Sequence, residues 1–449
     1  MTLLTLGIVL ALTGISFCKP DFIARTSDYS DAITFNDENL KNSKISGKIY
    51  IDGNAGWIAA KAATICTGSG TSSDPYIIED LIINGGGSGS CISIENSDVY
   101  FRIENCTVFN SYVGISLETT DNGSLRENNC TSNFYGINLK ESNNNYILGN
   151  LVKHNTNDGL HVENCSNIII SGNSIDNNGA QGLYADILSY VTISENTMNE
   201  NDGVGIFLSG CNNNTISGNI ANKNVEGGIG IGGDYNVISE NTMDSNEHGM
   251  DLWENSNYNH ILGNNITNNN GNGITIEGHY NIFSENNASY NGGFGARIDG
   301  NSNNVSGNEA SDNGESGIWV DNGNNNKVSG NIANHNTNGI QLQSSDDNEI
   351  SENTATNNEY GIHLTESNNN VISKNNLIGN DNCIEEVNCE GNTFKNNKCK
   401  KDVIPGYHLY ILLGILAIVV VSLSKRIKNL INIDIKKKIQ LNSFLFLHL

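Results

Sequence analysis

The sequence predicts a parallel β-helix, an all-β solenoid, followed by a single transmembrane helix near the C-terminus. Three observations predict the solenoid. An apolar phrase, Gly-Ile-x-Leu or a close variant, returns every 22 to 23 residues, and a fixed period of this kind indicates stacking of one structural unit. A second phrase, Asn-x-Ile-Ser-Gly-Asn or its variant with Glu in place of Gly, follows within the repeat. The apolar runs of both phrases alternate with polar residues. The first phrase begins at Gly114, Gly136, Gly159, Gly182, Gly205, Gly249, Gly273, Gly295, Gly317, Gly339 and Gly361.

The repeat has the features of one solenoid coil. Its apolar runs are short and have strand periodicity, and no window before the C-terminus has the pattern of an amphipathic helix. Asn and Gly separate the runs, and both residues accept the positive φ of a sharp corner. Each strand then pairs with the same strand of the next coil, about 4.8 Å away, which predicts about 13 coils over roughly 60 Å. Ile, Leu and Val should point inward, and Asn side chains should form hydrogen-bonded ladders at the corners.

Two other solenoids have comparable repeats, and both lack their motifs here. The Leu-x-x-Leu-x-Leu-x-x-Asn framework of a leucine-rich repeat is absent from the sequence. The Gly-Gly-x-Gly-x-Asp phrase of calcium-binding nonapeptide repeats is absent as well.

The N-terminus resembles an export signal in length and apolarity, although no basic residue precedes the apolar stretch Thr2–Phe17. We therefore expect a signal peptide over residues 1–18 and a leader and N-terminal cap over 19–65. Lipidation at Cys18 is disfavoured, because Phe17 occupies a position where such cleavage sites use a small residue.

The C-terminus predicts a membrane anchor. After the repeat domain (66–399) and a linker (400–406), the stretch Tyr407–Ser424 is uninterrupted and apolar, and Lys425 and Arg426 follow it. That length spans a bilayer, and the basic flank marks residues 425–449 as a cytoplasmic tail. The prediction is a single-pass cell-surface protein whose N-terminal domain is extracellular.

The charge excludes several classes of partner. The chain has a formal charge of −25, and the part before residue 400 contains 16 basic and 47 acidic residues, or −31. Nucleic acid and anionic lipid are poor partners for such a surface. Divalent cations, or simple solubility in salt, fit better.

The ten cysteines are too scattered for a metal knuckle. They fit either small apolar core residues or disulfides at the two caps, for instance Cys66 with Cys91. Cys106 and Cys130 are one repeat apart and are candidates for stacked neighbours, while the group at the C-terminal end of the repeats comprises Cys383, Cys389 and Cys399. Glycosylation sequons occur at Asn105, Asn122, Asn129, Asn164, Asn213, Asn265, Asn287 and Asn304.

The start of the repeat domain carries a family resemblance. The segment Cys66-Thr-Gly-Ser-Gly-Thr-Ser-Ser-Asp-Pro-Tyr-Ile-Ile-Glu-Asp80 leads into Ile82-Ile83-Asn84 and then into Cys91-Ile-Ser-Ile-Glu-Asn96. Followed by Asn-rich coils, it resembles the NosD-like right-handed parallel β-helix repeat (PbH1) proteins, common on archaeal cell surfaces, over about residues 45 to 399. The resemblance implies a right-handed solenoid but no single function, because the same coil occurs in carbohydrate-active enzymes, epimerases and proteins without known activity.

The family's name derives from a copper-linked periplasmic protein, and copper is not carried over to this chain. Copper favours clustered Met, Cys or His ligands. After the signal segment the only methionines are Met198, Met243 and Met250. No cofactor is therefore expected to be required, and Ca²⁺ is the one ion that the sequence suggests.

Function must lie on the residues that face outward, which the repeat arranges in columns. In Gly-Ile-x-Leu-x the two variable residues point out of the coil. The first column is predicted to be Ser116, Asn138, His161, Tyr184, Phe207, Gly230, Asp251, Thr275, Arg297, Trp319, Gln341 and His363. The second is predicted to be Glu118, Lys140, Glu163, Asp186, Ser209, Trp253, Glu277, Asp299, Asp321, Gln343 and Thr365.

One stretch of these columns is a candidate site. Glu277, Asp299 and Asp321 should follow one another about 4.8 Å apart, with Trp253 and Trp319 on either side and Arg297 beside Asp299. Aromatic faces and carboxylates suit a sugar-binding groove, and clustered carboxylates suit Ca²⁺. The alternative is that this row is simply a solvated face, because in a chain this acidic such runs of carboxylates arise from composition alone.

The sequence therefore predicts a structural or adhesive protein that binds surface glycans or extracellular proteins. A polysaccharide-active enzyme, either a uronate lyase or a glycoside hydrolase, is the alternative, with Asp299, Asp321 and Arg297 as candidate catalytic residues. Catalysis is disfavoured because the Asn-Thr-Asp and Gly-His-Gly phrases of β-helix polygalacturonases are absent.

Overall fold

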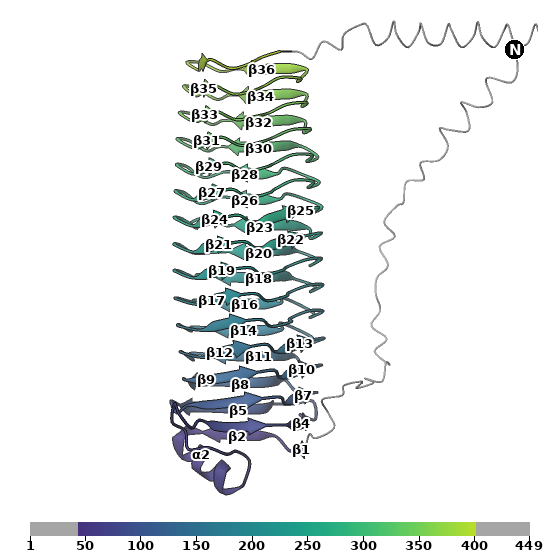
Figure 1. The fold of residues 1–449 in the computed structure, drawn as a ribbon, viewed down its shortest axis with the longest axis vertical. Coiled ribbons are helices and arrows are strands. Elements are labelled where there is room, and N and C mark those ends of the chain that lie inside the picture. Colours follow the sequence, from purple (N-terminus) through teal and green to yellow (C-terminus); the bar gives the residue numbers. More distant parts are fainter. Residues whose placement is uncertain (1–43, 401–449) are drawn as a thin grey trace, which may run out of the picture. The chain divides into compact units, whose positions relative to one another are not determined.

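Residues 44–400 are described by a computed structural model, and they form one parallel β-helix (Figure 1). Two sheets of fifteen strands each run along the solenoid, and every pair of neighbouring strands in them is parallel. The predicted all-β parallel solenoid is confirmed, but the predicted number of coils, about 13, is too low. The strands without the Gly-Ile-x-Leu phrase lie at both ends, two before the series and one after it.

Sheet B is built from the Gly-Ile-x-Leu phrases, and sheet C is built from the Asn-x-Ile-Ser phrases. Sheet B comprises β2 (Ile49–Asp52), β5 (Ser90–Ser97), β8 (Val113–Thr120), β11 (Tyr135–Lys140), β14 (Leu160–Glu163), β16 (Leu183–Asp186), β18 (Val204–Ser209), β20 (Gly227–Ile231), β23 (His248–Leu252), β26 (Ile274–Ile276), β28 (Ala296–Ile298), β30 (Ser316–Asp321), β32 (Asn338–Gln343), β34 (Tyr360–Thr365) and β36 (Asn382–Val387). Sheet C comprises β3 (Tyr76–Glu79), β6 (Phe101–Glu104), β9 (Gly123–Arg126), β12 (Tyr146–Leu148), β15 (Ile169–Ser171), β17 (Thr192–Ser194), β19 (Thr215–Ser217), β21 (Val237–Ser239), β24 (His260–Leu262), β27 (Ile282–Ser284), β29 (Asn304–Ser306), β31 (Lys327–Ser329), β33 (Glu349–Ser351), β35 (Val371–Ser373) and β37 (Thr393–Lys395).

The third side of the solenoid is less regular. It has a five-stranded parallel sheet at the N-terminal end and a two-stranded pair further along, and the remaining coils contribute single bridges. The five strands are β1 (Lys44–Ser46), β4 (Leu81–Asn84), β7 (Thr107–Phe109), β10 (Asn129–Thr131) and β13 (Leu151–Lys153), and the pair is β22 (Thr242–Asp244) with β25 (Asn265–Thr267). Strand pairing thus begins at Lys44, ahead of residue 66, where the repeat domain was predicted to start.

Asparagine ladders hold the coils together, as predicted. In each ladder the backbone N–H of one Asn donates to the side-chain Oδ1 of the Asn one coil later, and in most rungs the Nδ2 group donates to that oxygen as well. The longest ladder comprises Asn128, Asn150, Asn173, Asn196, Asn219, Asn241, Asn264, Asn286, Asn308, Asn331, Asn353, Asn375 and Asn397. A second ladder runs from Asn133 to Asn380, and a third from Asn214 to Asn392. The ladders satisfy amides that are almost completely buried beside the apolar core.

The corners have positive φ, and most of these positions are Asn or Gly, as the sequence predicts. Several are not. One corner alternates Glu195, Gly218, Glu240 and Gly263 along successive coils, and another contains tyrosines. The left-handed conformation costs a residue with a Cβ roughly 1–2 kcal/mol, so these exceptions mark positions where the side chain has a reason to be present.

Different devices close the two ends of the described solenoid. At the N-terminal end the helix α2 (Gly53–Ala62) covers the core, although no helix was predicted there. Its Trp57 is fully buried, stacks on Tyr76 at 5.1 Å between ring centroids, and donates from Nε1 to Ser97 Oγ at 3.0 Å. At the other end a disulfide joins Cys383 to Cys399, so the disulfide alternative holds for two of the three cysteines grouped there, while Cys389 is a free thiol.

Two other cysteine predictions are wrong. Cys66 and Cys91 are separate buried thiols rather than a disulfide. Cys106 and Cys130 are not stacked equivalents, because Cys130 pairs with Val108 while the Cys106 N–H donates to Asn128 at the start of the longest ladder. Both thiols are small core residues, which was the other interpretation of the sequence.

None of the helices within residues 44–400 is long and apolar enough to cross a membrane. The predicted anchor (407–424), its tail and the signal peptide lie outside the described residues.

Candidate functional site

The strand register of sheet B confirms the first outward column. Neighbouring strands pair Asn138 with His161, His161 with Tyr184 and Tyr184 with Phe207. The same register continues from Asp251 through Thr275, Arg297 and Trp319 to Gln341 and His363. Residues separated by one repeat are therefore true neighbours on this face.

Arg297 joins two of the predicted site carboxylates. Its Nη2 lies 2.8 Å from Asp299 Oδ2 and 2.9 Å from Asp321 Oδ2. Asp321 is almost completely buried, at 7% exposure, whereas Asp299 and Arg297 are partly exposed. One guanidinium thus neutralises part of the acidic row, and the structure brings these three predicted residues into direct contact.

Two carboxyl groups of this region have a raised pKa, chiefly because they are buried. Burial raises the pKa of Asp299 to about 6, with Asp321 and Glu277 adding to the increase against the opposing effect of Arg297. Burial also raises the pKa of Asp251, one coil before Glu277, while His248 and a hydrogen bond with Thr275 oppose the increase. Carboxyls with raised pKa in one place are a feature of functional sites as well as of ion-pair networks.

Asp299 gives a pH-dependent stability. Because its folded pKa is raised above the ordinary value, its contribution is fully present below about pH 4 and is lost as the pH rises through about 6. We expect the urea midpoint of the wild-type chain, measured relative to that of Asp299→Asn, to fall between pH 4 and pH 8. A difference between the two midpoints that does not change with pH would contradict this assignment.

Trp319 lies beside Arg297, as predicted. The Arg297 guanidinium carbon is 4.9 Å from the centroid of the Trp319 ring, and the ring also contacts Phe294 at 4.4 Å. Three polar atoms here are buried without a hydrogen-bond partner: Arg297 Nε, Asp299 Oδ1 and Trp319 Nε1.

Trp253 does not flank the acidic row in the predicted way, because its side chain turns toward the preceding coil. A Cβ built on Gly230 would lie 2.8 Å from the Trp253 ring, and a Cβ on Gly232 would lie 3.2 Å from it. The indole therefore rests directly on the backbone of β20. Its ring centroid is 4.9 Å from that of Phe207, two coils away.

Glycines make room for this tryptophan. Gly227 and Gly230 both pair in register with outward positions of the neighbouring strands, and Gly232 follows β20. All three outward positions of this coil thus lack a side chain, and Trp253 fills the space. The sequence contains the signal, Gly-Gly-Ile-Gly-Ile-Gly-Gly over residues 227–233, but the period alone does not reveal it.

A continuous series of rings, which was not predicted from the sequence, leads to Trp253. Successive ring centroids are 5.1 Å apart between Tyr135 and His161, 4.6 Å between His161 and Tyr184, and 5.5 Å between Tyr184 and Phe207. We call Tyr135, His161, Tyr184, Phe207 and Trp253 the aromatic series. All five are partly exposed.

His161 is held in place within this series by two carboxylates. Its Nδ1 is 2.8 Å from Asp158 Oδ2, and its Nε2 is 3.0 Å from Glu163 Oε1. Burial disfavours the charged ring, but the hydrogen bonds and charges of Asp158 and Glu163 outweigh burial and raise the pKa of His161. The two carboxylates thus favour the protonated form of this ring.

The donor groups do not fit copper. Met198, Met243 and Met250 are all buried in the core, at no more than 1% exposure. Within residues 44–400, no three His, Cys, Asp or Glu side chains are grouped so as to hold a metal ion. Ca²⁺ at Glu277, Asp299 and Asp321 stays a prediction, and Arg297 would compete with it for two of these carboxylates.

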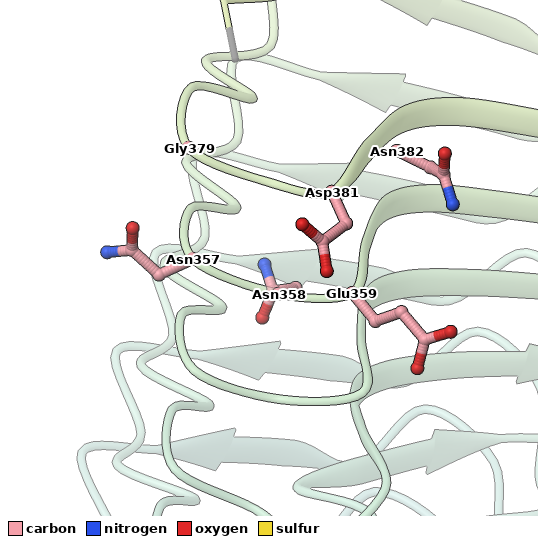
Figure 2. Close-up of a pocket in the computed structure, with 6 residues that line it drawn as sticks. All are labelled: Asn357, Asn358, Glu359, Gly379, Asp381 and Asn382. Carbon is pink, nitrogen blue, oxygen red and sulfur yellow. The ribbon is translucent and has the colours of Figure 1, made fainter. Parts of the chain in front are cut away.

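A depression elsewhere on the solenoid contains none of the predicted site residues (Figure 2). It lies beside the starts of β34 and β36 and is lined by Asn357, Asn358, Glu359, Gly379, Asp381 and Asn382. Its lining has no aromatic ring, so it offers hydrogen-bonding groups without a stacking surface.

Comparisons with known proteins concern the repeat domain. The family described as periplasmic copper-binding protein (NosD) matches residues 72–236, and the family described as right-handed beta helix region matches residues 252–399. No curated protein sequence matches the chain.

Among solved structures, the A-module of the Azotobacter vinelandii mannuronan C-5 epimerase AlgE6 matches with a TM-score of 0.47 at 15% identity, over 76% of this chain and 93% of that one. Tailspike protein 2 from Escherichia coli O157:H7 bacteriophage CAB120 matches with a TM-score of 0.39 at 14% identity, over 68% of this chain and 42% of that one.

Proposed function

Because the chain is a NosD-like right-handed parallel β-helix repeat protein, we propose that it serves as a binding scaffold whose outward sheet B face holds a linear glycan. The observation that carries the proposal is Trp253 lying flat on a coil whose outward positions are all glycine. One face of the indole is covered by backbone, and the ring is partly exposed. A flat aromatic surface of this kind stacks on the apolar face of a sugar ring.

The neighbouring residues extend this platform in both directions. The aromatic series precedes Trp253 along the rod, and Asp251, Glu277, Asp299 and Asp321 follow it. From Tyr135 to Asp321 the face spans eight coil spacings, about 40 Å, which suits an extended oligosaccharide. Rings would stack on sugars at one end, and carboxylates would accept hydrogen bonds from hydroxyls at the other.

The charge of the face selects the type of glycan. Between β23 and β30 it carries four carboxyl groups and one guanidinium, in a chain with a formal charge of −25. Uronate polymers would be repelled by this charge, whereas neutral or amino sugars would not. The proposed ligand is therefore a neutral or amino-sugar polysaccharide of a cell surface or matrix.

The setting of this activity is part of the proposal. The apolar stretch 407–424 would anchor the chain, and the rod would stand outside the cell with sheet B available to surface glycans. A protein that binds glycans along such a rod would act in adhesion or in organising a surface layer.

Hydrolysis is the second candidate, favoured by one observation. Asp299 and Asp321 share one guanidinium, and Asp299 has a pKa of about 6, so an acid and a carboxylate lie close together. A uronate lyase is less suited to the site, because Arg297, its candidate base, donates to two carboxylates and arginine does not deprotonate in proteins.

A glycan panel tests the proposal. The full-length chain in detergent is incubated with neutral, amino-sugar and uronate polysaccharides, with and without Ca²⁺, and both binding and new reducing ends are measured. We expect binding of neutral or amino-sugar chains without cleavage. Preference for uronates, or no binding at all, would overturn the proposal. New reducing ends that Asp299→Asn and Asp321→Asn each abolish would establish the hydrolase instead.

A further inference from the structure

Seven successive strands of sheet C, from β15 to β29, have an uncharged outward face, and the two outward residues of the preceding β12 are uncharged as well. Each strand contributes two outward residues, and none of the fourteen is Asp, Glu, Lys or Arg. They are Ile169, Ser171, Thr192, Ser194, Thr215, Ser217, Val237, Ser239, His260, Leu262, Ile282, Ser284, Asn304 and Ser306. In a chain with 49 acidic residues, a charge-free face of this length needs an explanation.

Exposed apolar side chains lie on the same face and along its edge. Val237 is 40% exposed and Leu262 is 42% exposed. At the corner where the chain passes from sheet B into sheet C, Tyr235, Tyr258 and Tyr280 are 44% to 55% exposed and stack with 5.1 Å between neighbouring ring centroids. We call the uncharged strands β15 to β29 with these three tyrosines the sheet C patch.

The backbone shows that these tyrosines are not incidental. All three have positive φ, between 57° and 59°, in a conformation that costs a residue with a Cβ about 1–2 kcal/mol. Other coils place Asn167, Asn213 or Asn325 at this corner, where the conformation is less costly. Stacking recovers part of the cost, about 0.5–1.5 kcal/mol per ring pair. It does not explain why half of each ring is left in water.

We infer that the sheet C patch is the contact surface between two copies of this chain. Two such acidic rods repel one another, so they can pack closely only through a face without charge. Seven strands span about 30 Å, and two outward columns with the tyrosine edge span about 20 Å. Each copy would bury roughly 600 Å², or about 1,200 Å² in total, the lower limit for a specific interface and the range of a weak dimer.

The rim of the patch fixes the orientation of the two rods. On the side opposite the tyrosines, the corner after sheet C presents the exposed Glu195, Glu240 and Glu285. In antiparallel face-to-face packing these columns would face each other and repel. In parallel packing about a two-fold axis along the rod, each glutamate column faces the partner's tyrosine column. The dimer is therefore parallel, with both C-terminal ends pointing the same way.

A matched pair of valines tests the surface. Val237 in β21 and Val371 in β35 occupy the same outward position of sheet C and are 40% and 39% exposed, but only Val237 lies in the patch. Sedimentation velocity of the full-length chain in detergent should show a concentration-dependent dimer. Val237→Asp should raise its dissociation constant at least about tenfold, equivalent to ~1.4 kcal/mol. Val371→Asp should leave the constant within about a factor of two of the wild-type value.

Two results would contradict the dimer. A wild-type chain that is monomeric at every concentration, or equal weakening by both substitutions, would overturn the inference. Unchanged circular dichroism of both variants shows that folding is not the cause. A glycan-binding signal that persists in Val237→Asp separates this dimer from the proposed function of sheet B.

Cross-linking tests the orientation. In a Cys389→Ser background, Ser306→Cys lies near one end of the patch and Ser171→Cys near the other. A short bis-maleimide should link two copies of Ser306→Cys to each other in the parallel dimer. Linkage only in a mixture of the Ser171→Cys and Ser306→Cys chains would establish antiparallel packing and overturn the assigned orientation.

Discussion

Replacing Asn219 by alanine should destabilise the solenoid by about 3–6 kcal/mol, although the substitution removes no apolar group. Its Oδ1 accepts both the N–H and the Nδ2 group of Asn196, and its own Nδ2 donates to Asn241 Oδ1 and to the Ile193 carbonyl. All of these groups are buried, and each one left without a partner costs about 1–3 kcal/mol. Urea unfolding followed by circular dichroism measures the loss.

Asn304→Ala is the control for this substitution. Asn304 lies on an outward position of β29, and its Oδ1 has no hydrogen-bond partner, so the change should be nearly neutral. Because each coil contacts mainly its neighbours, hydrogen exchange in Asn219→Ala should increase most in the coils next to β19. Equal stability losses for the two variants would contradict the ladder account.

Replacing Gly230 by alanine should strongly weaken glycan binding while leaving the fold intact. The new Cβ would lie 2.8 Å and 2.9 Å from atoms at the far end of the Trp253 ring, so the indole must move off the strand. A loss of at least about tenfold in affinity is expected, as for Trp253→Ala, because a displaced ring no longer presents a flat platform. Isothermal titration with the best glycan of the panel measures the effect.

Gly47→Ala and Tyr146→Ala are the matched controls for this pair. A Cβ on Gly47 would meet nothing within 4 Å, and Tyr146 is a 44% exposed ring on sheet C rather than on sheet B. Neither should change glycan affinity. If Gly230→Ala binds like the wild-type chain while Trp253→Ala does not, the ring would contribute without the geometry described here.

The sequence predicted the fold well because the period of the repeat dictates it. Once Gly136, Gly159 and Gly182 are known to stack, the register of sheet B follows, and so does the inward direction of the Ile and Leu residues. The number of coils was underestimated because β2 and β5 at the N-terminal end and β36 at the C-terminal end lack the phrase. The N-terminal helix was missed because its ten residues make up only about three turns and have no strong apolar periodicity.

The candidate site was predicted in part. Asp299, Asp321, Arg297 and Trp319 lie together because a column forces neighbours on consecutive coils to touch. The direction of Trp253 was not predictable from the column, since a long side chain can turn toward either adjacent coil. That direction is decided by Gly230 and Gly232, because their lack of side chains leaves space for the indole. The periodicity of apolar residues does not indicate where such space exists.

The asparagine ladders have a directional consequence. Every rung donates toward the C-terminal end and accepts from the N-terminal side, as in the step from Asn196 through Asn219 to Asn241. The N–H···Oδ1 bonds therefore all have the same direction along the rod, while the Nδ2 groups also donate back to carbonyls of the preceding coil, as Asn219 does to Ile193. The C-terminal coil carries charges of both signs, with Lys395, Lys398 and Lys400 beside Glu385, Glu386 and Glu390. The ladders thereby give the rod a direction, because each coil offers Oδ1 acceptors to the coil before it and N–H donors to the coil after it.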